Sequence, residues 1–142
     1  WHLEQKLDST LNVANFLPGM ANLETEMPML YDEGVLRRRI SLNRWVELTS
    51  TNAAKLFGMF PQKGTISVGS DADLVVWNPD RKRTINGDEM ASTADYDIYE
   101  GREVQGWPEY TISRGDMIVA EGKMIGERGR AKRVVRGPHK NL

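Results

Sequence analysis

The sequence contains no cysteine, only two histidines and no long apolar run, and each of these absences excludes a class of protein. Without cysteine the chain has no disulfide scaffold, no thiolate zinc site and no cysteine nucleophile. Its longest apolar runs, such as Leu74–Trp77, are far shorter than the roughly 18 residues that a membrane helix needs. No signal-peptide pattern opens the chain and no Asn-x-Ser/Thr sequon occurs, so we expect a cytoplasmic protein without membrane contact.

The two histidines, His2 and His139, both lie close to an end of the chain. They form no His-x-His or His-Glu-x-x-His pattern, whereas a catalytic zinc site normally needs three protein ligands. A Ser-His-Asp triad would have to be built on one of these terminal residues, where a general base is poorly preorganised. The glycines also miss the spacing of a phosphate-binding loop. We therefore predict no catalytic residue and no metal ligand within this chain alone.

Charge is distributed unevenly along the 142 residues, although the net charge is only −1. Residues 123–142 contain seven basic residues and one acidic residue, a net charge of +6, so the preceding part carries −7. A basic tail is compatible with nucleic acid, but this one lacks interleaved aromatic residues and follows an acidic body. We expect a solvated arm or a subunit-contact arm, and no nucleic-acid partner.

A short helix is predicted around Met29, Leu30 and Tyr31. Glu24 and Glu26 precede it, where acidic side chains favour the positive end of a helix dipole. Pro28 suits the first turn and Gly34 suits a position just beyond the end.

The strongest helical periodicity runs from Ser41 to Phe60. The polar stretch Thr49–Asn52 interrupts it, and such residues compete for backbone hydrogen bonds, so we predict two helices with a break there. Pro61 and Gly64 are expected to end the second helix. Three aromatic residues on this stripe are expected to pack in the core: Trp45, Phe57 and Phe60.

Strand signals replace the helical period after Gly64. Residues 65–68 alternate, Gly69–Asp71 has turn composition, and Asp73–Trp77 is a β-rich run that Asn78-Pro79 is expected to end. We therefore predict two short strands separated by a turn.

A hairpin is predicted near the end of the chain. Tyr110–Arg114 and Met117–Glu121 flank Gly115-Asp116, which suits a two-residue turn. The Arg114-Gly115-Asp116 tripeptide is interpreted as part of this turn and not as an adhesion motif. Residues 86–109 are expected to form a long loop.

Asp71 and Asp73 are two residues apart and would face the same side of a strand, as a catalytic carboxylate pair does. Asp71 follows Gly69-Ser70, however, where an aspartate commonly bonds its own turn backbone. We favour the structural role for both carboxylates.

From Ser41 to Gly58, and again from Lys63 to Val75, the sequence resembles a late segment of the dihydropyrimidinase and hydantoinase family. The run Lys-Gly-x-Ile-x-x-Gly-Ser-Asp-Ala-Asp is typical of cyclic amidohydrolases in general. Three further matches lie downstream, and with them the similarity covers roughly residues 14–126: Tyr99-Glu100-Gly101, Gly106-x-Pro108 and Ser113-Arg114-Gly115.

This resemblance implies an α/β protein with a (β/α)8 barrel and a small β-sandwich domain built from both chain ends. Family members hold two divalent metal ions, usually zinc, through four histidines, an aspartate and a carbamylated lysine. All of these ligands lie upstream of the present segment, and the aspartate belongs to an Asp-His-x-Pro motif. In the family this motif lies some twenty residues before a substrate-contacting asparagine, which corresponds to Asn15 here. The resemblance therefore implies that the present segment starts just after the last metal ligand.

Asn15 is the one site residue that the resemblance carries over. In the family, the backbone of the corresponding asparagine contacts the amide face of the substrate ring, from a loop at the carboxyl end of the barrel. The family usually has Pro-Asn-Gly where this chain has Ala14-Asn15-Phe16. Phe16 beside the contact is expected to reshape the substrate pocket. The alternative for Asn15 is an ordinary turn residue.

We therefore predict the last loop and helices of the barrel over residues 1–60, a β-sandwich portion with a long loop over 61–126, and a basic arm at a subunit interface over 127–142. The complete protein would open a hydantoin, a dihydropyrimidine or a related ring to an N-carbamoyl amino acid, as a homo-oligomer, either a dimer or a tetramer. The partners of the segment are the cyclic amide and the rest of its own polypeptide. One alternative is a non-catalytic, oligomeric binding protein of the collapsin response mediator type, and another is an autonomous binding module.

Overall fold

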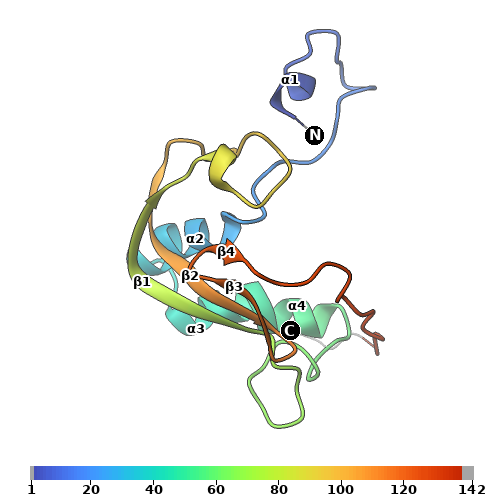
Figure 1. Ribbon diagram of the computed structural model, residues 1–142, viewed down its shortest axis with the longest axis vertical. Helices are drawn as coiled ribbons and strands as arrows, with labels where there is room; N and C mark the ends of the chain where they lie inside the picture. Colours follow the sequence, from blue (N-terminus) through green and yellow to red (C-terminus); the bar gives the residue numbers. More distant parts are fainter. Residues whose placement is uncertain (1, 139–142) are drawn as a thin grey trace.

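A four-stranded antiparallel sheet with short helices on one face organises the chain (Figure 1). The structure is a computed structural model that describes residues 2–138. The strands lie side by side in chain order, each antiparallel to the next. They are β1 (Leu74–Thr84), β2 (Glu103–Ser113), β3 (Asp116–Ala120) and β4 (Lys123–Met124). The α/β class is thereby confirmed.

The helical elements are short and most of them precede the sheet in the sequence. They are α1 (Leu3–Lys6), α2 (Glu26–Leu30), the π-helical turn η1 (Tyr31–Leu36), α3 (Leu42–Val46), the π-helical turn η2 (Glu47–Thr51), α4 (Asn52–Leu56) and the 3-10 turn η3 (Gly87–Glu89). Between residues 2 and 138, none of these helices is long and apolar enough to cross a membrane.

The predicted break at Thr49–Asn52 is wrong, because α3, η2 and α4 run continuously from Leu42 to Leu56. The hydroxyl of Thr49 donates to the carbonyl oxygen of Trp45, one turn back, at 2.9 Å. Such back-bonding competes with the backbone ladder, and the helix widens into a π-helical turn there without ending.

The predicted helix ends are also wrong. The helix stops at Leu56, before Pro61 and Gly64, because the amides of Met59 and Phe60 both turn back to the carbonyl of Ala54 (2.8 and 3.1 Å). The helix predicted around Met29 begins at Glu26 and has Pro28 near its start, but it continues through η1 to Leu36, past Gly34.

Residues 65–68 do not form the predicted strand. They lie in a loop in which Ile66 and Val68 are almost fully exposed, at 88% and 105%, because no described strand pairs with them. In contrast, β1 does not stop at Asn78-Pro79 but continues to Thr84. The ladder shifts register between Asn78 and Lys82, so the proline falls where no paired amide is needed.

The last part of the predicted long loop is strand, because β2 begins at Glu103 and pairs with β1 with two shifts of register. The hairpin between β2 and β3 is confirmed, but its two turn residues are Arg114 and Gly115, one position earlier than predicted. Both have positive φ angles, 51° and 85°, which matches the twist of the flanking strands.

The core lies between the sheet and the helices. Met29, Ile85, Val104 and Trp107 are buried together. An aromatic cluster next to them joins the helices to β1 through the rings of Tyr31, Trp45 and Trp77, whose centroids are 4.9–5.3 Å apart.

Trp45 is buried as predicted, whereas Phe57 is 52% exposed and Phe60 only half-buried. Gly106 makes the aromatic packing possible. A Cβ atom at this position would lie 2.3 Å from the ring of Tyr31, and its φ angle is +95°. The sheet can therefore approach η1 only because residue 106 has no side chain.

Candidate functional site

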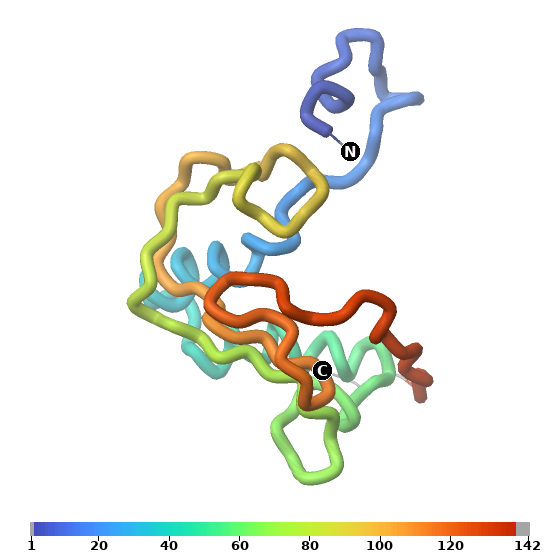
Figure 2. The backbone as a smooth tube through the Cα atoms, viewed as in Figure 1, coloured from blue at the N-terminus to red at the C-terminus, as the bar shows by residue number. Residues whose placement is uncertain are grey.

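Asn15 lies on an N-terminal arm, residues 2–24, that extends beyond the sheet and the helices packed on it (Figure 2). The Asn12 amide donates to the Asn15 side-chain oxygen at 2.6 Å, and the Asn15 amide donates to the Asn12 carbonyl at 3.1 Å. The amide of Phe16 bonds the same carbonyl at 2.8 Å. The turn is thus closed by its own residues, and no donor within residues 2–138 reaches the Asn15 carbonyl oxygen.

A mostly apolar cavity of about 350 Å³ lies beside this turn. Its lining residues are Lys6, Leu11, Asn12, Val13, Phe16 and Leu17. Phe16, the neighbour of Asn15, is 58% exposed and lines it. The arm therefore has a backbone acceptor without a described partner at Asn15, and the next residue, Phe16, lines an apolar recess. An acceptor and an apolar recess on neighbouring residues suit a small ring with one polar edge.

Lys6, the last residue of α1, holds the next part of the arm. Its ammonium group donates to three consecutive carbonyl oxygens: those of Leu17, Pro18 (3.3 Å) and Gly19 (2.6 Å). No motif singles out this lysine, because a lysine in a short amphipathic segment is usually solvated.

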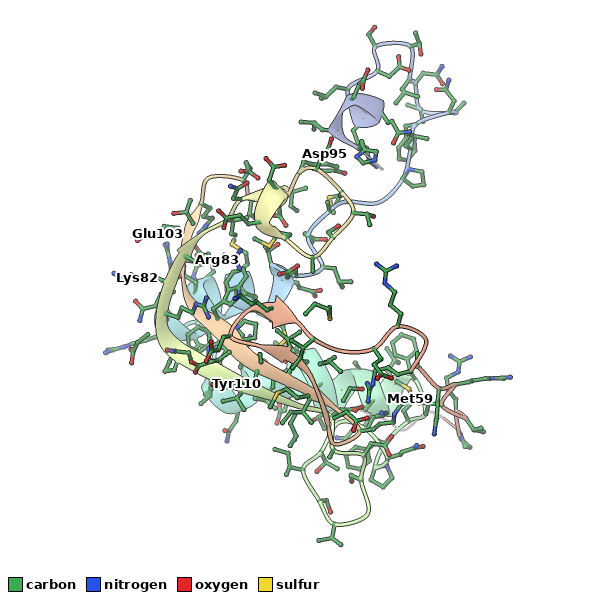
Figure 3. The ribbon with its side chains drawn as sticks, viewed as in Figure 1. Met59, Lys82, Arg83, Asp95, Glu103 and Tyr110 are labelled. Atoms are coloured by element: carbon green, nitrogen blue, oxygen red, sulfur yellow. The ribbon has the colours of Figure 1, made fainter. Side chains whose placement is uncertain are left out.

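The loop between β1 and β2, residues 85–102, contacts the start of the arm. Asp95 accepts a hydrogen bond from the Leu3 amide at 2.7 Å, and its other oxygen lies 3.5 Å from His2 Nδ1. The Leu3 hydrogen bond lowers the pKa of Asp95 below its usual value. Figure 3 shows Asp95 beside α1. His2 is thereby engaged in a contact between two segments that are far apart in the sequence.

The same loop also binds the far end of the arm. The Ala91 amide donates to the Glu24 carboxylate at 2.7 Å, and the Ile98 amide donates to the Ala21 carbonyl at 3.1 Å. The arm thus contacts the sheet-connecting loop at both of its ends, while the Asn15 turn between them projects outward (Figure 2).

Asp71 and Asp73 form no catalytic pair, because Lys63 lies between them. Its ammonium group is 2.8 Å from Asp71 and also pairs with Asp73. Hydrogen bonding to Lys63 lowers the pKa of Asp71. Burial opposes ionisation of Asp73, but hydrogen bonds from Lys63 and the Arg114 amide more than compensate and lower its pKa. Lys63 thus closes the loop over residues 61–73 on itself, and Asp73 attaches this loop to the β2–β3 turn.

The part of the chain that the structure describes does not fit a pair of divalent metal ions. It contains no group of three or more histidine, cysteine, aspartate or glutamate side chains that could hold one ion. The acidic pair already binds the ammonium group of Lys63, and His2 faces Asp95. His139 lies outside the described residues.

A larger cavity, of about 830 Å³, lies between parts of the helix over residues 42–56 and β1, beside the contact of Trp45 with Trp77. Apolar side chains dominate its lining, among them Trp45, Val46, Ala54, Leu74, Val75 and Trp77. The indole N–H groups of Trp45 and Trp77 are buried without a hydrogen-bond partner in the described chain. This surface has the character of an interior that further protein would cover.

Comparison with known proteins gives a consistent match along the chain. The model of the amidohydrolase family matches residues 7–118, a range that includes Asn15 and the loop over residues 85–102. A D-hydantoinase from Ralstonia pickettii is 44% identical over 128 residues, which cover 89% of this chain and 28% of that protein.

Two solved structures extend the match to three dimensions. The D-hydantoinase (dihydropyrimidinase) from Thermus sp. has a TM-score of 0.87 and 42% identity, covering 93% of this chain and 29% of that one. The dihydropyrimidinase from Brevibacillus agri has a TM-score of 0.79 and 44% identity, covering 82% and 25%. The chain spans about a quarter of the length of the curated relatives it matches.

Proposed function

The chain belongs to the amidohydrolase family, and from this membership we propose that it is the carboxyl-terminal part of a hydrolase that opens cyclic amides. The observation that carries the proposal is the match to hydantoinases and dihydropyrimidinases at more than 40% identity over most of the chain. The substrate would be a hydantoin, a dihydropyrimidine or a related ring, and the product an N-carbamoyl amino acid.

We propose the same division of the chain as before: 1–60 as the end of a (β/α)8 barrel, 61–126 as part of a β-sandwich, and 127–142 as an arm. The apolar cavity between the helix over residues 42–56 and β1 supports an incomplete domain pair that the rest of the polypeptide would cover.

The arm over residues 127–142 lies along its own chain where it is described. Arg130 pairs with Asp116 and donates to the Ser113 carbonyl at 2.7 Å, and the Gly137 amide donates to the Gly58 carbonyl at 2.7 Å. Residues 139–142 lie outside the described residues, as does Trp1. A homo-oligomer in the cytoplasm, with this arm at a subunit contact, remains our proposal for the complete protein.

For the substrate contact we propose the Asn15 carbonyl oxygen. The Asn15 amide is already used within the turn, so the carbonyl is the backbone group left to accept a hydrogen bond from a ring N–H. Phe16 and its cavity would contact the apolar part of the ring or its substituent. The two divalent metal ions of this enzyme class, usually zinc, would be held by residues outside this chain.

The complete protein, loaded with zinc or manganese, tests the activity on hydantoin, dihydrouracil and allantoin, with the N-carbamoyl product measured by mass spectrometry. Ring opening of at least one compound is expected. If none opens, the hydrolase proposal fails and the non-catalytic binding protein of the same fold takes its place.

The Asn15→Ala variant tests the site. Loss of the side-chain cap would displace the turn and lower kcat/KM by about tenfold or more. Asn43→Ala is the matched control, because Asn43 is exposed on α3 and far from the arm in the sequence. Equal kinetics of the two variants would refute the role of Asn15.

A further inference from the structure

We infer that Lys6 is a positioning residue that fixes the substrate-side turn of the arm by binding the backbone of Leu17, Pro18 and Gly19. The role in turnover depends on the proposed function, whereas the attachment itself does not. The inference rests on one observation: the ammonium group of Lys6, at the end of α1, donates to three consecutive carbonyl oxygens.

Lys6 is the sole hydrogen-bond donor to these three carbonyls among residues 2–138. Pro18 has no amide hydrogen, and the amides of Leu17 and Gly19 donate to no acceptor within that range. The segment over residues 17–19 therefore has no backbone–backbone hydrogen bonds of its own, and its conformation depends on Lys6.

The ammonium group of Lys6 suits this task because it carries three hydrogens and no acceptor. No carboxylate in the described range pairs with this ammonium group, so all of its hydrogen bonds go to the carbonyl groups of residues 17–19. A charged donor shared among three carbonyl dipoles is stronger than a neutral hydrogen bond, and it is only half-exposed here.

The attachment lies directly beside the candidate site. Leu17 follows Asn15 by two residues, and Leu17 and Lys6 both line the cavity next to Phe16. At its other end α1 is bound to Asp95 in the loop over residues 85–102. Lys6 thus connects the Asn15 turn to the sheet through α1 and Asp95.

The first experiment uses the complete protein and compares Lys6→Met with Lys82→Met. Lys82 is exposed on β1 and points away from the arm, which makes it a matched control (Figure 3). We expect faster peptide-level hydrogen exchange over residues 11–20 in Lys6→Met only. We also expect kcat/KM to fall by about 10- to 100-fold, mainly through KM, with little change in the melting temperature.

A chemical rescue separates the charge from the packing. The 142 residues contain no cysteine, so Lys6→Cys introduces the first thiol into this segment. Alkylation with 2-bromoethylamine rebuilds a side chain of the length of lysine with its ammonium group, whereas iodoethane gives a neutral side chain. Wild type treated in the same way is the control. We expect recovery with the first reagent only, and Lys6→Arg should retain more activity than Lys6→Met.

Three results would overturn the inference: identical exchange and kinetics for Lys6→Met and Lys82→Met, equal rescue by both reagents, or a lower melting temperature with unchanged KM. An inactive wild type would refute the proposed function. The exchange measurement would then still decide whether Lys6 holds the arm, because it needs no substrate.

Discussion

The hydroxyl of Thr25 donates a hydrogen bond to the carboxylate of Asp97 at 2.9 Å, between two side chains that are 0% and 6% exposed. The other oxygen of Asp97 accepts from the Tyr99 amide at 2.9 Å. The base of the N-terminal arm is thereby joined to the loop between β1 and β2, 72 residues away. A buried polar pair of this kind fixes two segments in one arrangement, because leaving either partner unsatisfied is costly.

Replacing Thr25 by valine removes this donor and keeps the shape of the side chain. We expect the free energy of unfolding to fall by about 1–3 kcal/mol, the cost of a lost hydrogen bond to a buried charged group. Denaturant unfolding of the complete protein measures the change. Thr25→Ser keeps the hydroxyl and is the control, so equal losses in the two variants would show that packing and not hydrogen bonding matters here.

Gly106→Ala is expected to be strongly destabilising, because the new methyl group would meet the ring of Tyr31 at 2.3 Å on a backbone with positive φ. Backbone strain and overpacking together predict a loss of about 3–5 kcal/mol. Gly101→Ala is the matched control, since Gly101 also has positive φ but has no atom within 4 Å. That variant should lose only about 1–2 kcal/mol from the backbone. Comparable melting temperatures for the two would contradict the close contact.

The ion pairs of Lys63 in the loop over residues 61–73 are expected to weaken at low pH and at high pH. The folded pKa of Asp73 lies below the ordinary value of 3.8, so its stabilising contribution is present above pH 3.8 and is lost as the pH falls through the folded pKa. Burial disfavours the charged form of Lys63, but its two carboxylate partners raise its pKa above 10.5. Its contribution is present below pH 10.5 and is lost as the pH rises through the folded pKa.

Hydrogen exchange of wild type and Lys63→Met at matched pH tests this dependence. Comparing the two proteins at the same pH cancels the intrinsic exchange rate, so the remaining difference in protection reports the effect of removing the Lys63 ammonium group. Greater protection of the loop in wild type is expected at pH 7 and should disappear at acid pH. A difference that persists unchanged below the pKa of Asp73 would contradict the ion-pair explanation.

The isolated 142 residues are not expected to unfold in a single cooperative thermal transition. Apolar side chains such as Val75, Val76 and Phe57 are 43–52% exposed, and the large cavity beside β1 stays open within residues 2–138. Differential scanning calorimetry of the isolated segment measures this directly. One sharp transition would favour the autonomous binding module over the proposal of a partial domain pair.

Local sequence signals predicted elements more reliably than their ends. The helical stripe containing Trp45 and the hairpin after Tyr110 are present, because side-chain period and turn composition act within a few residues. Residues 65–68 alternate as a strand would, yet no described strand pairs with them. Pairing is a long-range property that an alternating pattern cannot supply.

The residues of the candidate site likewise fall into those that the sequence indicated and those that only the structure revealed. The resemblance singled out Asn15 from its surrounding motif, and the structure adds the turn that closes on Asn12. Lys6 and Asp95 carried no signal, since neither lies in a motif and each binds backbone groups of a distant or irregular segment.

The sequence by itself determined the α/β class, the absence of cysteine chemistry and the resemblance to cyclic amidohydrolases, because composition, period and motif are properties of neighbouring residues. Only the tertiary structure decided that Lys63 pairs with Asp71 and Asp73, that Gly106 admits Tyr31, and that the loop over residues 85–102 binds the N-terminal arm. These contacts join residues separated by up to 92 positions. Their free energy depends on distances that the folded chain alone sets.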